Sequence, residues 1–347
     1  MNIRNFTRQV QILGLAVCLL GLGAQAFAQG SLTPPGAPAP TMKSLQDIYD
    51  AVTTGPIAVN STNTPGNSAV IYIISQPGSY YLTTNITGEV GRDGIQITTA
   101  SVTLNLNGFS VRGVPGSGSG IFASSVADRV TVANGTVTGW GSYGVYLRNE
   151  SLVADVKAQN NTSFGIRTNY YCIIRNCVAR GNQSDGIRSE GNAVITGCVS
   201  TGNSSNGITI GGSGGEVSGC DSYNNGSSGI SAGAGGGWVI RNNSCSSNTF
   251  HGINVCAENR VLDNVCNNNG SGAENGYGIY VRCGGNYVEG NLCYNNDVGV
   301  DALTNGNEVV VRNSAIGNTI SYVGTTGNDF GPVGTAASTN PHTNISH

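Results

Sequence analysis

Between positions 143 and 190, aromatic, arginine and acidic side chains recur every 21 residues. Two series of three residues have this 21-residue interval, and each member of the second series comes three positions after its counterpart in the first. Two further residues come two positions after the first and last members of the second series. The set comprises Tyr143, Phe164 and Asp185, then Tyr146, Arg167 and Arg188, and finally Arg148 and Glu190. Between residues 148 and 188 the chain has five arginines and one lysine against three acidic residues, a local excess of +3.

Aromatic faces that stack on sugar rings, together with arginines that pair with carboxylates, are what a groove for an acidic polysaccharide requires. Six members would bind substrate: Tyr143, Tyr146, Arg148, Phe164, Arg167 and Arg188. Asp185 and Glu190 would act as general acid and base if their carboxyl groups lie about 5–9.5 Å apart. A competing interpretation is that all eight are solvated strand residues, with Arg188 paired to either acid at little net energy.

A repeat must bring these residues together, because a Gly followed by Ile or Val recurs ten times. These anchor glycines are Gly94, Gly120, Gly144, Gly165, Gly186, Gly207, Gly229, Gly252, Gly278 and Gly299, at intervals of 21–26 residues. An asparagine stands four residues before the anchor in six cases: Asn161, Asn182, Asn203, Asn225, Asn248 and Asn295. Such a unit cannot bury its own apolar face, but it can when stacked on copies of itself.

The repeat predicts a parallel β-helix with one coil per anchor, about ten coils in all. Leu-dense repeat lines and nonapeptide calcium-roll repeats are absent, and 53 Gly with 41 Asn among 347 residues argue against ordinary helices. The Ile or Val after each anchor would point inward, and the asparagines would stack as a ladder. The residue two after each anchor would point outward, giving a column that runs through Tyr146, Arg167 and Arg188 to Tyr280 and Asp301. His251 and Tyr277, which immediately precede anchors, would stand beside this column.

Three segments resemble the entry region of secreted bacterial right-handed parallel β-helix proteins, which share the pectate-lyase-like fold. They are Pro77–Leu82, Val102–Phe109 and Asn134–Val137, and the ending at 331–341 is also similar. The resemblance covers about residues 42–347 and implies an all-β, right-handed parallel β-helix. It does not settle function, because members include lyases, hydrolases, epimerases, and tail or adhesin proteins. A calcium-dependent lyase of this group would have three or four acidic residues beside an arginine, and this face has two. No cofactor is therefore expected, with calcium considered only for a lyase.

The first 28 residues are typical of a secretory signal peptide. Arg4 and Arg8 precede an apolar run at 12–22, and cleavage is expected between Ala28 and Gln29. The run is too short to span a bilayer, which takes roughly 20 residues. We therefore expect a secreted, periplasmic or cell-surface protein without a transmembrane segment. Without the two arginines, 14 basic and 19 acidic residues remain, a net charge of −5, which argues against nucleic-acid binding.

Nine cysteines remain after signal cleavage, an odd number that argues against a fully paired disulfide framework. Six recur about once per coil, at Cys177, Cys198, Cys220, Cys245, Cys266 and Cys293, and are interpreted as a stack of buried thiols. The alternative is coil-to-coil disulfides, for which Cys256 and Cys283 are the best placed. Short Cys/His spacings are absent, so no metal site is predicted.

The sequence is expected to divide into a signal peptide (1–28), a Pro-rich linker (29–41), an N-terminal cap with entry strands (42–91), the repeats (92–320) and a C-terminal tail or cap (321–347). A short helix at 44–52, with a Ser44–Asp47 capping box, would cover the first coil. Two functions are considered. One is a non-catalytic envelope or polysaccharide-binding scaffold, and the other is a glycoside hydrolase or uronate lyase that uses the face described above. The glycan would be acidic or neutral.

Overall fold

The computed structural model describes residues 55–270, 276–302, 306–324, 327–335 and 337–346. Strands in this part of the chain form one 12-stranded and one 24-stranded sheet, and every strand pair is parallel apart from an isolated bridge between Pro65 and Tyr72. The described residues contain no helix. The predicted signal peptide, linker and capping helix lie outside them.

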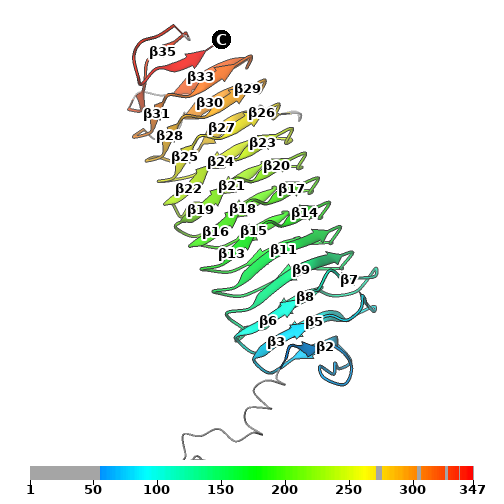
Figure 1. The fold of residues 1–347 in the computed structure, drawn as a ribbon. Coiled ribbons are helices and arrows are strands. Elements are labelled where there is room, and N and C mark those ends of the chain that lie inside the picture. Colours follow the sequence, from blue (N-terminus) through cyan, green and yellow to red (C-terminus); the bar gives the residue numbers. More distant parts are fainter. Residues whose placement is uncertain (1–54, 271–275, 303–305, 325–326, 336, 347) are drawn as a thin grey trace, which may run out of the picture. The chain divides into compact units, whose positions relative to one another are not determined.

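The strands build a β-solenoid, which confirms the predicted all-β fold (Figure 1). The 12-stranded sheet contains the Ile or Val that follows each of the ten predicted anchors. It gains one strand before them, β2 (Val70–Ile74), and one after them, β33 (Ile320–Gly324). The solenoid therefore has about twelve turns where the sequence predicted about ten, because the two end coils lack the Gly-Ile/Val signature.

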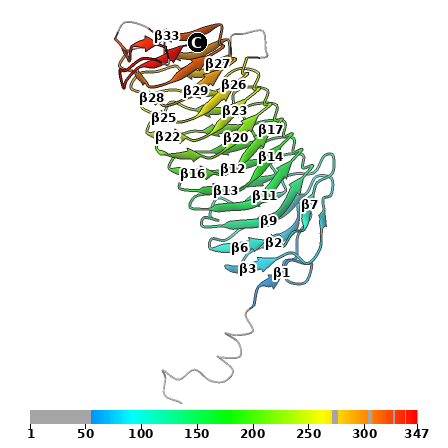
Figure 2. The same cartoon turned by 45° about the horizontal axis from the view of Figure 1, so that its top comes forward.

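A typical coil has three short strands joined by tight corners. β12 (Ile166–Thr168) belongs to the 12-stranded sheet, while β13 (Ile173–Arg175) and β14 (Val178–Arg180) belong to two ladders of the larger sheet. Figure 2 shows these ladders along the stack, with β16 (Ala193–Thr196) following β13 and β17 (Val199–Thr201) following β14. They join at β9 (Thr131–Thr138) and β11 (Leu152–Gln159), which pass unbroken through the corner.

The interior of each coil is filled by the side chains that the repeat predicts to point inward. The Ile or Val after each of the ten anchors is fully buried. The anchor glycine lets neighbouring coils approach closely. A Cβ on Gly165 would lie 2.6 Å from both the Asn182 side-chain nitrogen and the Gly186 carbonyl oxygen. A larger residue at this position would push two coils apart.

Most corners place at least one residue in the left-handed region, where φ is positive. At the corner after the third strand these residues include Asn160, Gly181, Gly202, Asn224, Ser247, Asn268, Asn295 and Gly317. Glycine has no Cβ penalty there, and asparagine is the side chain that tolerates the region best. This conformational demand accounts for much of the Gly and Asn content.

The residue after this corner points inward and forms the predicted asparagine ladder. Its members are Asn161, Asn182, Asn203, Asn225, Asn248, Asn269, Asn296 and Asn318, and each side-chain oxygen after the first accepts bonds from the preceding member's amide nitrogens at 2.9–3.1 Å. The prediction was wrong for Asn295, which is the left-handed corner residue, while Asn296 takes its place in the ladder. The spacing to the anchor shortens by one residue in that coil.

A second ladder at another corner explains the cysteine pattern. Cys177, Cys198 and Cys220 stack there, and then Asn243 takes over and is followed by Asn264, Asn291, Asn313 and Asn344. Cys245 pairs in register with Cys266, and Cys266 with Cys293, on the third strands. The six buried thiols thus form two columns of three, not the single stack that was predicted. Burial, followed by contacts with Cys245 and Cys293, raises the pKa of Cys266, so this thiol stays protonated.

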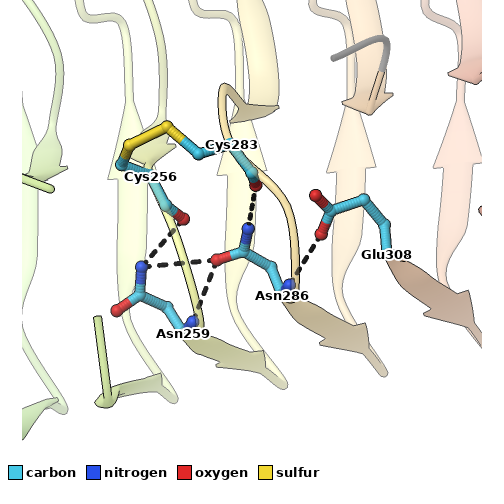
Figure 3. The surroundings of a disulfide bond; sticks show 5 residues. All are labelled: Cys256, Asn259, Cys283, Asn286 and Glu308. Carbon is cyan, nitrogen blue, oxygen red and sulfur yellow. Dashed lines mark hydrogen bonds between the residues drawn. A yellow bond between two sulfur atoms is a disulfide. The ribbon is translucent and has the colours of Figure 1, made fainter. Parts of the chain in front are cut away.

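The third corner contains a disulfide between Cys256 and Cys283, with 4.6 Å between the two Cα atoms. Figure 3 shows it beside a short polar ladder in which Asn259 bonds to Asn286, whose backbone N–H donates to Glu308 at 2.7 Å. Glu308 is fully buried, and burial raises its pKa. The coil-to-coil alternative therefore holds for this one pair, while the other seven cysteines of the described residues are free.

We predict that Asn225→Ala lowers the free energy of unfolding by at least ~3 kcal/mol, measured by urea denaturation. The change removes the acceptor used by Asn203 and the amide that donates to Asn248, so several buried polar groups lose partners at ~1–3 kcal/mol each. Asn224→Gly is the matched control. This neighbouring residue is exposed with φ of 55°, a conformation that glycine also adopts. Equal losses in the two variants would contradict the ladder's role.

Candidate functional site

The predicted outward column is present on the 12-stranded sheet. Tyr146 on β10 (Val145–Tyr146) pairs in register with Arg167 on β12, and Arg167 pairs with Arg188 on β15 (Ile187–Ser189). The register continues to Tyr280 on β27 (Tyr277–Val281) and Asp301 on β30 (Val298–Ala302). Asp301 departs from the expectation, because it is only 2% exposed. We call the eight residues of the sequence-predicted site the arginine–aromatic face.

Aromatic rings of this face form a continuous cluster. Tyr143 stacks on Phe164 with ring centroids 5.8 Å apart, and it contacts Tyr146 at 5.2 Å. Phe122, on the preceding coil, contacts Tyr146 at 5.5 Å and extends the cluster. The 21-residue interval thus brings the aromatic residues together as the sequence predicted, in side-chain contact across adjacent coils.

Arg167 is at the centre of this cluster. Its guanidinium lies 5.1 Å from the Tyr146 ring centroid and 5.6 Å from that of Phe164, within cation–π range. It also donates to the Tyr143 hydroxyl at 3.3 Å. Arg148 donates to the Tyr146 hydroxyl at 2.7 Å. The aromatic side chains therefore hold both guanidinium groups in fixed orientations.

The two acidic residues occupy different environments. Glu190 contacts two arginines, Arg188 at 3.4 Å and Arg167 at 3.8 Å. Asp185 is buried, with its Oδ2 atom 3.9 Å from Arg188. Its Oδ1 atom accepts bonds from both the backbone N–H and the side-chain amide of Asn206 on the next coil. Asp185 therefore connects two coils, whereas Glu190 balances the positive charge of the face.

Unpartnered polar atoms gather along this side of the solenoid. Seven buried side-chain polar atoms have no hydrogen-bond partner among the described residues. Five of them belong to the outward column or to positions two residues beyond it: Ser124 Oγ, Arg148 Nε, Arg167 Nε, Thr209 Oγ1 and Asn254 Oδ1. Because buried polar groups are ordinarily paired, this concentration distinguishes this side of the solenoid from the rest.

A second aromatic cluster on the same side was not among the predicted site residues. Tyr277 stacks on Tyr280 at 4.7 Å, and the His251 ring lies 5.0 Å and 4.9 Å from them. Burial, followed by the charge of Arg282, lowers the pKa of His251 to about 4, so the ring is neutral at pH 7. All three occupy the columns that the repeat defines, so the repeat pattern could have identified them as site residues.

A depression at the corner after the 12-stranded sheet was also missed. It has a volume of about 550 Å³ and is lined by Asn149, Glu150, Tyr170, Tyr171, Asn192, Gly212 and Ser213. In three coils these residues come one to four positions after the last residue of the arginine–aromatic face, and Gly212 and Ser213 belong to the next coil, which contributes nothing to that face. The tyrosines lie in corners, which the outward column does not include, so the repeat pattern alone did not select them.

In the part of the chain that the structure describes, no cluster of three or more His, Cys, Asp or Glu residues is arranged to hold a metal ion. Within the same residues, no helix is long and apolar enough to cross a membrane.

The sequence matches the family described as right-handed beta helix region, over residues 71–215 and 168–316. The chain belongs to this family. No curated protein matches it significantly.

Solved structures with a similar fold include two mannuronan C-5 epimerase A-modules from Azotobacter vinelandii. The AlgE6 module has a TM-score of 0.54 and 16% identity over 87% of this chain and 93% of its own, and the AlgE4 module has 0.53 and 16% over 81% and 82%. The Dettilon tailspike protein has a TM-score of 0.60 and 17% identity over 88% of this chain and 65% of its own length. At such identities the likeness shows the fold alone.

We predict that the protein loses stability as pH falls from about 6.5 towards 4. In this interval unfolded chains protonate the imidazole at position 251 while the folded protein holds it neutral, so the unfolded state binds more protons. His251→Gln should flatten this part of the stability profile, and His342→Gln, at an exposed position, should not. Nuclear magnetic resonance titration gives a direct check. A His251 pKa near 6.5 would contradict the prediction.

Proposed function

We propose that this chain is a secreted right-handed β-helix protein that binds an acidic polysaccharide without transforming it. The observation that carries the proposal is the packing of Arg167 and Arg148 against tyrosine and phenylalanine rings on two adjacent coils. Guanidinium groups held in this way can pair with sugar carboxylates, while the rings present apolar surface to the sugar faces.

The charge of the face and the predicted localisation also support the proposal. The eight residues of the arginine–aromatic face include three arginines and two acidic residues, a net charge of +1 on an acidic protein, which favours an anionic ligand at this face. The predicted signal peptide would deliver the chain to the periplasm, the cell surface or the medium, where such polymers occur. Two solved structures with a similar fold are mannuronan C-5 epimerase modules, so a uronate polymer is the first ligand to test.

The alternative is a polysaccharide-active enzyme, a hydrolase or a lyase, in which Asp185 and Glu190 are catalytic. The proximity of Arg188 to both carboxylates favours this reading, because it places the two acids beside one cation. The two bonds from Asn206 count against it, since they commit one Asp185 oxygen to the contact between coils. We therefore place binding first and catalysis second.

Under the binding proposal, the Arg167→Ala/Arg188→Ala double variant should lose at least ~10-fold in affinity for a uronate polymer, because charge-assisted hydrogen bonds contribute ~1.5–3 kcal/mol each. Affinity electrophoresis or calorimetry on the mature protein measures the effect. The control is Arg175→Ala/Arg180→Ala, which removes the same charge from exposed positions on the other two strands of a coil. Unchanged binding in the first variant would refute the proposed face.

The same incubations separate binding from catalysis when reducing ends and unsaturated products are followed. We expect neither product. If products form, Asp185→Asn should abolish them while leaving binding intact, because the amide oxygen still accepts from Asn206 and only proton transfer is lost. Product formation by the unaltered protein would overturn the non-catalytic proposal in favour of the enzyme.

A further inference from the structure

We propose that the corner depression is a second binding site, which takes a neutral sugar. The depression spans the same corner of four successive coils, with Glu150 on the first, Tyr170 and Tyr171 on the second, Asn192 on the third and Gly212 on the fourth. It lies outside the arginine–aromatic face, and its function does not depend on that face binding an acidic polymer.

Two tyrosines in the depression are exposed, unlike most large apolar residues of the solenoid. Tyr170 is 45% exposed and Tyr171 is 62% exposed. Two further exposed apolar side chains continue the surface, because Ile173 (44% exposed) pairs in register with Val194 (40% exposed) on the adjoining strands. The result is an apolar surface beside a hollow, which the folding of the coils does not require.

Backbone conformation adds a second observation on Tyr171, which shares its left-handed corner position with Arg129 and Glu150 of the two preceding coils. Its φ is +60°, in the left-handed region that asparagine and glycine adopt readily and bulky side chains avoid. Asn192 occupies the same corner position one coil later, with φ of 57°. A tyrosine here is unfavourable for folding and mostly exposed. Strain of this kind is found where a side chain serves function.

A glycine, Gly212, forms part of the lining of the hollow. The Tyr170 ring lies against Gly212, so that a Cβ added there would be 3.4 Å from the Tyr170 Cε1 atom. Gly212 also has φ of +55°. A Cβ at this position would first meet the backbone of Gly191, 2.7 Å from its nitrogen and 2.9 Å from its Cα atom, so the close approach of adjacent coils requires glycine here.

The lining favours an uncharged sugar over other ligands. Tyrosine rings match the apolar faces of sugars, and the Asn192 amide with the Ser213 hydroxyl offers both donors and acceptors for ligand hydroxyls. The Asn149 amide is already bonded to Asp128 and to the Tyr170 backbone N–H. Glu150 contributes a carboxylate, and its nearest cation, Arg129, is 3.8 Å away. That negative charge disfavours a uronate here, in contrast with the arginine–aromatic face.

Three variants of the mature protein test the site: Tyr171→Asn, Tyr170→Ala and, as the control, Tyr223→Ala. Tyr223 is also an exposed tyrosine but lies on β20 (Asp221–Tyr223), outside the depression. The probes are neutral gluco-, xylo- and manno-oligosaccharides, with binding followed by chemical-shift perturbation and calorimetry. Thermal unfolding is measured on each variant in parallel.

We expect at least one neutral oligosaccharide to bind, and affinity to fall at least ~10-fold in Tyr170→Ala and in Tyr171→Asn but not in Tyr223→Ala. Tyr171→Asn should also raise the unfolding temperature by about 2 °C or more, because asparagine relieves the strained corner. Loss of binding in a variant that is more stable excludes unfolding as the cause.

Two results would overturn the inference. One is that no oligosaccharide of the panel binds, or that binding is unchanged in both depression variants. The other is that these variants weaken uronate polymers alone, which would make the depression an end of the arginine–aromatic face. The Arg167→Ala/Arg188→Ala variant distinguishes the two sites, because it should keep its affinity for the neutral sugar even if the acidic polymer proves not to be a ligand.

Discussion

The structure depends on one constraint: each coil must turn three sharp corners in little more than twenty residues and still satisfy every polar group that the corners bury. Left-handed residues make the turns, and the inward residue that follows is bonded to its equivalent in the next coil. Asn182, for example, donates both its backbone N–H and its side-chain amide to the side-chain oxygen of Asn203 in the next coil. A single coil is therefore incomplete, and stability belongs to neighbouring pairs of coils.

Much of this arrangement could be predicted because it repeats. The inward Ile and Val, the asparagine ladder and the outward column all follow from one period, and the strand registers agree with them. The errors occur where the period changes. Asn295 and Asn296 exchanged roles when one coil shortened by a residue before its anchor. The cysteines changed column at Asn243 because asparagine and cysteine both fit the inward corner position.

The candidate site was only partly predictable, for a related reason. Periodicity says which residues share a column, and so it brought Tyr146, Arg167 and Arg188 together. It says nothing about how a carboxylate is used. Asp185 connects two coils because Asn206, on the next coil, donates to its carboxylate, and the repeat pattern does not specify that contact. Tyr171 lies at a corner where the pattern tolerates any residue that accepts a positive φ, and nothing in the spacing marks it.

The disulfide has a mechanical consequence. Cys256 and Cys283 are 27 residues apart and join the corners of adjacent coils. A stack held by nearest-neighbour contacts peels from its ends, one coil after another, when tension is applied. Under tension from the carboxyl end, peeling would run freely until it reached this covalent link, where the segment between the two cysteines cannot extend. The link thus carries the tension directly from Cys283 to Cys256, so the residues between the two cysteines bear no load while the coils on either side of them still can peel.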